Sequence, residues 1–124
     1  MNTVGMGLTY ARIRVENIFD ATSSQEIELL VDTVALYSLI PASMLKRIGV
    51  KPKASMEFEL ADGSTVEREV GQASFRYDGR DAISPVIFGA ESDSAILGVV
   101  TLEAMGLEVD PVRKLIRPTR LILY

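Results

Sequence analysis

Apolar and polar residues alternate with a period of two along most of this chain, and no other feature limits its fold as strongly. Successive side chains of a β-strand point to opposite faces of the sheet, so the alternation predicts strands that each bury one face. Residues 12–16 and 27–31 both follow the pattern, and the polar residues 20–25 connect them. The sequence therefore predicts a mostly β protein that begins with a hairpin.

A second, longer hairpin is predicted from residues 56–60 and 65–77. The four residues between these stretches are Ala-Asp-Gly-Ser, a composition typical of turns because Asp and Gly tolerate the backbone angles that tight turns require. A further turn at residues 78–80 precedes a strand over residues 82–88. This strand contains Pro85, which predicts an edge position because proline cannot donate a hydrogen bond to a neighbouring strand.

Only two short segments have the features of helices. Residues 41–48 begin with a proline and are followed by Gly49, and residues 101–105 are followed by Gly106. Proline is favoured in the first turn of a helix, and glycine is favoured just after the last turn because it adopts the left-handed conformation. We therefore expect two helices of one or two turns each, within a protein that is otherwise built from strands.

The composition limits the chemistry that the protein can use. With 124 residues the chain has the length of one domain, so we expect residues 1–124 to form a single domain. It contains no cysteine and no histidine, which excludes disulfides and thiol catalysis and leaves only carboxylates as metal ligands. We therefore expect neither a metal site nor a cofactor.

The charge and hydropathy of the chain argue against nucleic acids and membranes as partners. Thirteen basic and seventeen acidic residues give a net charge of 13 − 17 = −4, and basic residues never cluster in runs longer than two. Nucleic acid is therefore not an expected partner. No apolar run approaches the ~18 residues that cross a bilayer, and the N-terminus does not have the pattern of a signal peptide. We expect a cytoplasmic protein without a membrane partner.

Three short motifs occur along the chain at defined spacings. An Asp-Thr-Val-Ala sequence follows three aliphatic residues, an Asp-Gly turn lies 62 − 32 = 30 residues further on, and an Ile-Leu-Gly sequence ends 98 − 32 = 66 residues after the first aspartate. The candidate functional residues in these motifs are Asp32, Thr33, Val34, Ala35, Asp62, Gly63, Ile96, Leu97 and Gly98. Each motif alone has an ordinary explanation, namely a turn cap, a hairpin turn and the end of a core strand.

Together the three motifs make the chain resemble the retropepsin-like aspartic peptidases, the single-domain relatives of retroviral proteases. The resemblance covers nearly the whole length and implies a closed or nearly closed β-barrel with one short C-terminal helix. It implies that Asp32 and Thr33 are catalytic, that residues 96–98 are a structural motif, and that the turn at Asp62 and Gly63 is the tip of a flap. By the same resemblance Val34, Ala35, Asp62 and Gly63 contact the substrate.

The chemistry implied by the resemblance requires two carboxylates a few ångströms apart, which share one proton because both cannot ionise together. The ionised member takes a proton from a water while the protonated member hydrogen-bonds the scissile carbonyl. This chain supplies one such aspartate, so the resemblance implies a C2 homodimer that cleaves an extended peptide or protein substrate. The apolar C-terminus, residues 115–123, is expected to be buried in the domain or against a partner chain, where its strands would join the dimer interface.

Val34 is the one departure from the active-site motif, which has glycine at this position. Valine keeps the backbone N–H that holds the carboxylates but adds a branched side chain. If the loop accepts an L-residue, Val34 narrows the cleft and leaves the carboxylate pair in place; if it does not, displacing reacting groups by 1 Å costs about 10²-fold in rate.

The leading hypothesis is an aspartic endopeptidase. Two alternatives remain open: a catalytically silent module of the same fold that binds peptides or dimerises, and a small monomeric β-barrel that binds a ligand.

Overall fold

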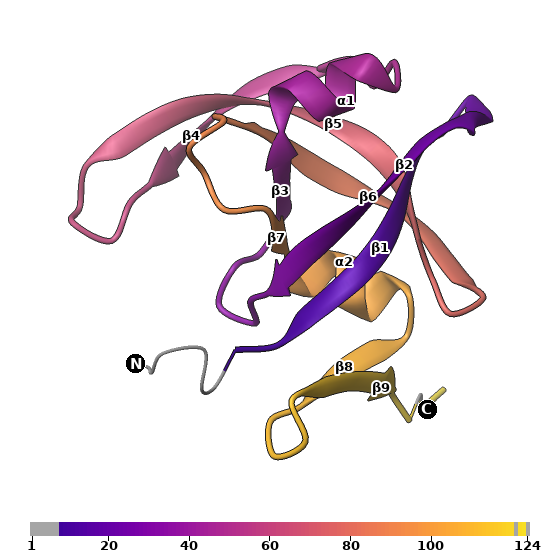
Figure 1. Ribbon diagram of the computed structural model, residues 1–124. Helices are drawn as coiled ribbons and strands as arrows, with labels where there is room; N and C mark the ends of the chain where they lie inside the picture. The colour runs from indigo at the N-terminus through magenta and orange to yellow at the C-terminus, as the bar shows by residue number, and fades with distance from the viewer. Residues whose placement is uncertain (1–7, 121, 124) are drawn as a thin grey trace.

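The structure is a computed structural model in which residues 8–120 and 122–123 are described (Figure 1). These described residues form nine strands and two short helices. In chain order these are β1 (Tyr10–Asn17), β2 (Asp20–Val31), β3 (Ser38–Pro41), α1 (Ala42–Arg47), β4 (Ala54–Glu59), β5 (Thr65–Tyr77), β6 (Arg80–Gly89), β7 (Ile96–Leu97), α2 (Val99–Ala104), β8 (Leu107–Asp110) and β9 (Leu115–Pro118). The predicted mostly β architecture is confirmed.

The main sheet closes on itself into a barrel. Its strands lie in the order β1-β2-β7-β3-β6-β5-β4, and β1 also pairs with β5. This last pairing joins Arg14 to Arg76, Val15 to Phe75 and Glu16 to Ser74 in antiparallel register, so the ring passes through every strand of the sheet except β4. The predicted closed barrel is therefore present, with β4 attached to its outside.

The interior of the barrel is filled by the apolar side chains of the alternating strands. On β1 the inward residues Ile13 and Val15 are fully buried, while the arginines between and beside them face the solvent. Phe75 on β5 and Leu97 on β7 are also fully buried and belong to the same core. At ~1.5–3 kcal/mol for each large apolar side chain, this core is the main stabilising contribution to the barrel.

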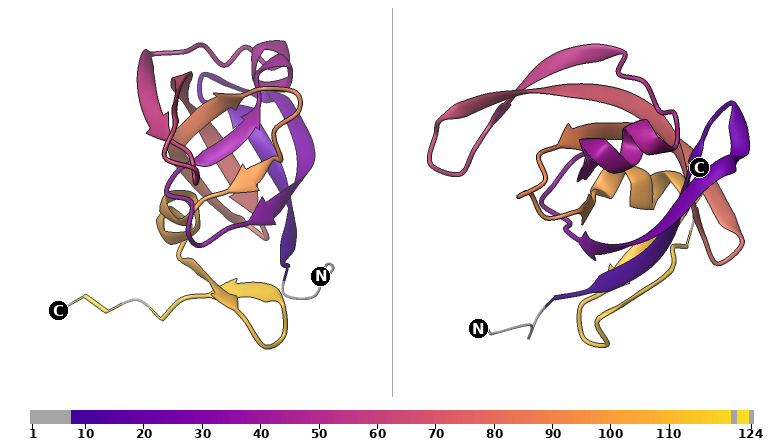
Figure 2. Two further views of the ribbon diagram at one scale, coloured as in Figure 1. Left: turned by 90° about the vertical axis from the view of Figure 1, so that its left-hand side faces the viewer. Right: turned by 45° about the horizontal axis from the view of Figure 1, so that its top comes forward.

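Strand β5 is long because it pairs with β4 over its first half and with β6 over its second half. The first half is Thr65 to Val70, and the second half runs from Val70 onward. The β4–β5 hairpin therefore extends beyond the barrel, as Figures 1 and 2 show. The second strand of this hairpin has its predicted bounds, and the first, predicted at residues 56–60, is β4 (Ala54–Glu59). The buried face predicted for β4 is wrong. Only Phe58 of β4 is partly buried, because the hairpin projects where there is no core to pack against.

Two details of the strand prediction are also wrong. Residues 20–25 are not a loop but the first part of β2, and the turn consists of Ile18 and Phe19. Strand β6 is an inner strand between β3 and β5, although Pro85 predicted an edge. Pairing with β3 begins only at Val86, so at Pro85 the strand has β5 on one side and no strand on the other. The absent N–H of proline is tolerated there for that reason.

Both predicted helices are present, and each ends one residue before its predicted last residue, with a glycine just after its C-cap. Gly49 and Gly106 follow α1 and α2 with φ angles of 81° and 71°, the left-handed conformation that glycine adopts without a Cβ clash. Helix α2 begins at Val99, two residues before its predicted start, because Gly98 rather than Val100 is its N-cap.

The chain ends in a second small sheet that lies below the barrel in Figure 1. Strands β8 and β9 pair antiparallel from Leu107 with Pro118 to Asp110 with Leu115. Ile116 is buried as predicted, but Ile122 and Leu123 are 80% and 87% exposed, so burial of these two within their own domain is wrong. Residues 121 and 124 lie outside the described part of the chain. Neither helix of the described ranges is both long enough and apolar enough to cross a membrane.

Candidate active site

The strand order brings two of the three sequence motifs together. Strand β7 lies between β2 and β3, parallel to β2 and antiparallel to β3. The loop of residues 32–37 that joins β2 to β3 must therefore cross the end of β7 at which the chain passes through Gly98 into α2. The first and third motifs, far apart in sequence, meet at this crossing.

Backbone hydrogen bonds hold the Asp32 loop, residues 32–37, against β7 and α2. The Asp32 N–H donates to the Leu97 carbonyl at 3.1 Å. At the other end of the loop, the carbonyls of Ala35 and Leu36 accept from the first N–H groups of α2, on Val99 and Val100, at 2.9 and 3.1 Å. The first turn of a helix has N–H groups without partners inside the helix, so the loop supplies them.

The Asp32 side chain lies in a tight turn at the start of this loop. Its Oδ1 accepts a hydrogen bond from the Val34 N–H at 2.9 Å, and its carbonyl accepts one from the Ala35 N–H at 3.2 Å. Among the described residues no partner is recorded for Oδ2, and the side chain is only half-buried. One carboxylate oxygen is thus fixed by the loop, and the other is free to accept or donate a hydrogen bond.

Val34 fits this loop without backbone strain. Within residues 8–120 and 122–123, Asp78 and Lys114 are the non-glycine residues with positive φ, so Val34 does not occupy the left-handed region that favours glycine. Its side chain is 93% exposed and meets no part of its own chain that would displace the loop. The backbone of this loop accepts an L-residue, and the Val34 N–H still reaches Asp32.

At the crossing, Gly98 is required because a side chain would have no room there, and not because of its backbone conformation. A Cβ at this position would lie 2.5 Å from the Tyr37 carbonyl carbon and 2.7 Å from the carbonyl oxygens of Leu36 and Tyr37. Its φ is −88°, which any residue adopts, so the requirement comes entirely from the Asp32 loop passing so closely. The glycine of the third motif therefore fixes the distance between that loop and α2.

A buried group of three hydroxyls supports the crossing, and the sequence analysis did not identify it. Thr101 lies 2.6 Å from Ser38 and 2.8 Å from Ser84, measured between hydroxyl oxygens, and all three residues are buried. The Ser38 hydroxyl also accepts a hydrogen bond from the Gly98 N–H at 3.0 Å. The only trace of this group in the sequence is that β3, β6 and α2 each carry one small polar residue at an inward position.

The second motif, at Asp62 and Gly63, lies apart from the other two. It forms the tip of the β4–β5 hairpin, and no hydrogen bond between it and the Asp32 loop is recorded among the described residues. Gly63 has a φ of 86°, and Asp62 accepts hydrogen bonds from the hydroxyl and the N–H of Ser64. These bonds, first the hydroxyl and then the N–H, lower the pKa of Asp62. Figure 1 shows the tip and the Asp32 loop on the same side of the barrel.

A single chain therefore presents the Asp32 loop on an open surface. Two surface cavities, of about 660 and 380 Å³, lie elsewhere, around the β1–β2 turn, and residues 32–37 line neither of them. Among the described residues no cluster of three or more acidic residues is arranged to hold a metal ion. The chemistry available to this loop in one chain is a single carboxylate that can exchange one proton.

Comparison with known proteins identifies the fold. No protein-family model matches the sequence, and no curated protein matches it. Among solved structures, the chain is similar to the EIAV protease complexed with the inhibitor HBY-793, with a TM-score of 0.61 and 16% sequence identity. The similarity covers 94% of this chain and 93% of that one. The chain therefore has a retropepsin-like fold, as the three motifs predicted.

Proposed function

We propose that this protein is an aspartic endopeptidase whose active site forms between two copies of the chain. The observation that carries the proposal is the Asp32 loop. In a retropepsin-like fold, this loop holds one half-exposed carboxylate, with one free oxygen, where it crosses the junction of β7 and α2. The solved neighbour is a retroviral protease, which supports peptide hydrolysis as the reaction.

The proposed reaction needs the Asp32 carboxylates of both copies to lie beside each other. Two carboxylates at such a distance hold one proton between them. The ionised one removes a proton from a water molecule, and the resulting hydroxide attacks the scissile carbonyl carbon. The protonated one donates to the carbonyl oxygen, which gives a tetrahedral diol without a covalent bond to the enzyme. Collapse of the diol transfers a proton to the leaving amine and restores the shared proton.

The other motif residues have roles in this proposal that follow from their positions. Thr33 is exposed beside Asp32, where its hydroxyl and backbone would contact the same loop of the second copy. Val34 and Ala35 would contact the substrate from below, and the tips at Asp62 and Gly63 would close over it from above and exclude water. Ile96, Leu97 and Gly98 would position Asp32 without touching the substrate.

The dimer is part of the proposal because one chain holds only one aspartate of this kind. The exposed apolar residues at the C-terminal end support it: Ile122 and Leu123 are exposed in the single chain, and Leu115 on β9 is partly so. Large apolar side chains that are exposed in a single chain are often covered by another chain. If two copies are required, cleavage per chain falls on dilution once the protein concentration drops below the dimer dissociation constant.

The test is cleavage of an unfolded protein substrate between about pH 3 and pH 7, the range in which carboxylates titrate. The proteins compared are the parent chain, Asp32→Asn, Val34→Gly, and Asp78→Asn as a control. Asp78 is an exposed turn residue with a φ of 49°, which asparagine also adopts, so this control makes the same chemical change away from the Asp32 loop.

Cleavage by the parent and by Asp78→Asn, together with its loss in Asp32→Asn, would support the proposal. Equal cleavage by Asp32→Asn and the parent would show that Asp32 is not the catalyst. Cleavage by Val34→Gly alone would show that valine silences the site, and would favour the alternative of a peptide-binding or dimerisation module.

A further inference from the structure

The larger surface cavity lies far from the Asp32 loop and has a distinct chemistry. It measures about 660 Å³ and lies between the β1–β2 turn, the end of α1 and the linker that leads to β4. Strand β2 separates it from the Asp32 loop: Asp20, which lines the cavity, begins this 12-residue strand, and Val31, which precedes Asp32, ends it. A ligand in this cavity would therefore not touch the candidate active site.

Four cationic side chains and one carboxylate line this cavity, which we call the basic groove. The cations are Lys46, Arg47, Lys51 and Lys53, and the carboxylate is Asp20. This local excess of positive charge contrasts with the net charge of −4 of the whole chain. The potential inside a recess depends on the charges that line it, so the basic groove attracts anionic groups although the protein as a whole is acidic.

The cations of the basic groove are not neutralised by their own chain. Within the described ranges, no carboxylate lies within 4.0 Å of any of the four, and Arg47 instead donates to the Gln25 side-chain oxygen at 2.7 Å. Other cations of the chain do have such partners. The arginines within 4.0 Å of a carboxylate are Arg12, Arg14, Arg68, Arg76, Arg113 and Arg117.

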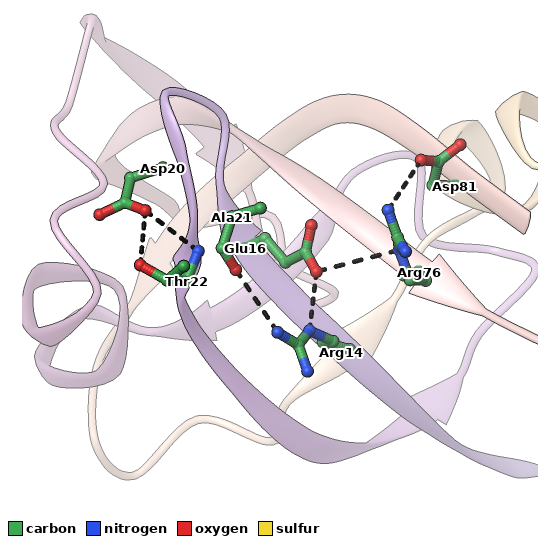
Figure 3. Close-up of polar contacts among 7 residues, drawn as sticks. All are labelled: Arg14, Glu16, Asp20, Ala21, Thr22, Arg76 and Asp81. Carbon is green, nitrogen blue, oxygen red and sulfur yellow. Dashed lines mark hydrogen bonds and ion pairs between the residues drawn. The ribbon is translucent and has the colours of Figure 1, made fainter. Parts of the chain in front are cut away.

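Figure 3 shows how the neighbouring charges are already satisfied. The Asp20 carboxylate accepts from the hydroxyl and the N–H of Thr22 at 2.6 and 3.0 Å, and these bonds lower its pKa. Arg14 and Arg76 both approach the buried Glu16 carboxylate, at 2.7 and 3.8 Å. Asp20 is thus held by its own strand, and Arg14 and Arg76 are paired with Glu16. The four cations of the basic groove, in contrast, have no carboxylate within 4.0 Å among the described residues.

Ile18 and Phe19 form an apolar wall of the basic groove, and the turn in which they lie does not require apolar residues. The β1–β2 turn consists of Ile18 and Phe19 rather than the Gly or Asp typical of such turns. The turn is stabilised by Asn17 instead, whose side-chain oxygen accepts a hydrogen bond from the Phe19 N–H at 2.8 Å. The Phe19 side chain is 92% exposed at the edge of the groove, a position at which an aromatic residue gains nothing from its own fold.

The two walls of the basic groove are tied together before any ligand binds. The Asn17 side-chain amide donates to the Ile48 carbonyl at 3.0 Å and so links the turn to the end of α1. Gly49 makes this approach possible, since a Cβ there would lie 2.9 Å from the Asn17 amide nitrogen. A groove with fixed walls loses little conformational entropy on binding, which favours affinity.

We propose that the basic groove binds an acidic peptide segment that carries an aromatic or aliphatic side chain. The cations would pair with its carboxylates, and Phe19 and Ile18 would cover its apolar side chain. A small inorganic anion would use the cations and leave the apolar wall and most of the volume empty. A nucleic acid would bring a long run of negative charge against the acidic remainder of the chain. The proposal does not depend on peptidase activity.

The test uses a fluorescein-labelled ten-residue peptide in which aspartates and glutamates flank a central phenylalanine, with binding followed by fluorescence anisotropy at low salt. A second peptide has alanine in place of the phenylalanine. The proteins are the parent chain, the double variant Lys51→Glu/Lys53→Glu, Phe19→Ala, and Lys114→Glu as a control that reverses one charge elsewhere on the surface. Lys114 is exposed in the turn between β8 and β9, outside the groove. All substituted side chains are exposed, and a thermal melt verifies that each variant folds.

We expect the double variant to bind about tenfold more weakly, Phe19→Ala about fivefold more weakly, and Lys114→Glu like the parent. We also expect the alanine peptide to bind about fivefold more weakly to the parent. No binding by the parent would overturn the proposal. Equal weakening by Lys114→Glu, or equal binding of both peptides, would overturn it in favour of nonspecific charge attraction. Displacement by millimolar inorganic phosphate or tighter binding of a single-stranded oligonucleotide would instead identify a small-anion or a nucleic-acid site.

Discussion

Replacing Gly98 with alanine tests whether the crossing of the Asp32 loop over α2 is as close as the structure shows. The added Cβ would lie 2.5 Å from the Tyr37 carbonyl carbon and 2.7 Å from two carbonyl oxygens. An ordinary contact between such atoms is about 3.5 Å, so the loop or the helix has to move by nearly 1 Å. All three atoms belong to the backbone, which cannot rotate aside as a side chain does.

The expected loss of stability follows from this geometry. Overpacking a close contact costs about 1–3 kcal/mol, and we expect the upper end because backbone has to yield on the loop side. The shift also strains the hydrogen bonds from Val99 and Val100 to the loop carbonyls. For a chain of this length, a loss of about 3 kcal/mol lowers the melting temperature by about 10 °C.

Thermal unfolding followed by circular dichroism measures this effect, with Gly63→Ala as the matched control. Gly63 has a φ of 86° but nothing within 4 Å of an added Cβ, so this variant carries backbone strain without a clash. We expect it to lose only about 1 kcal/mol, or about 3 °C. If Gly98→Ala melts with the parent, or no lower than Gly63→Ala, the close crossing is not present in solution and the argument for the geometry of the Asp32 loop fails.

Three further predictions concern buried polar groups. Thr101→Val keeps the shape of the side chain but leaves the Ser38 and Ser84 hydroxyls short of a partner, so we expect urea denaturation to show a loss of about 1–3 kcal/mol; an unchanged midpoint would contradict this. Glu16→Gln removes the charge that Arg14 and Arg76 share, and should lower the free energy of unfolding by about 2 kcal/mol at pH 7, against no change for the exposed Glu28→Gln. The N–H of Arg113 in particular lowers the pKa of Asp110, so this carboxylate stabilises the folded state above its ordinary pKa of 3.8 and the contribution disappears as pH falls below that value. Asp110→Asn should therefore flatten the loss of stability between about pH 4 and pH 2, and identical acid curves for variant and parent would refute it.

The fold was predictable where local patterns and tertiary packing agree. The alternation on β1 predicted its buried face correctly because Ile13 and Val15 lie in a closed barrel that has one inside and one outside. The same alternation failed on β4, where Met56 and Phe58 follow the pattern in a hairpin that leaves the barrel. Period two reports which side chains share a face of a strand, but not whether that face meets a core.

The candidate site was predictable in its residues but not in its contacts. The Asp-Thr and Ile-Leu-Gly motifs named the residues of the crossing, because a carboxylate on a tight turn and a glycine at a close approach each require a particular residue type. The hydroxyls of Ser38, Ser84 and Thr101 left no such signal, since small polar residues are common and these three are far apart in sequence. The basic groove was missed for the same reason, because its cations come from a helix and a linker that the β1–β2 turn approaches only in the folded chain.

The sequence by itself determined the class of fold, the positions of most strands and turns, and the residue types at the crossing, because these depend on periods and backbone preferences that act over a few neighbouring residues. Only the tertiary structure decided that Val34 is tolerated, that β4 leaves the barrel, and that Gly98 faces the backbone of Tyr37. Each of these outcomes depends on how closely two segments distant in sequence approach each other. That distance is set by the packing of the whole barrel and is not carried by any single stretch of the chain.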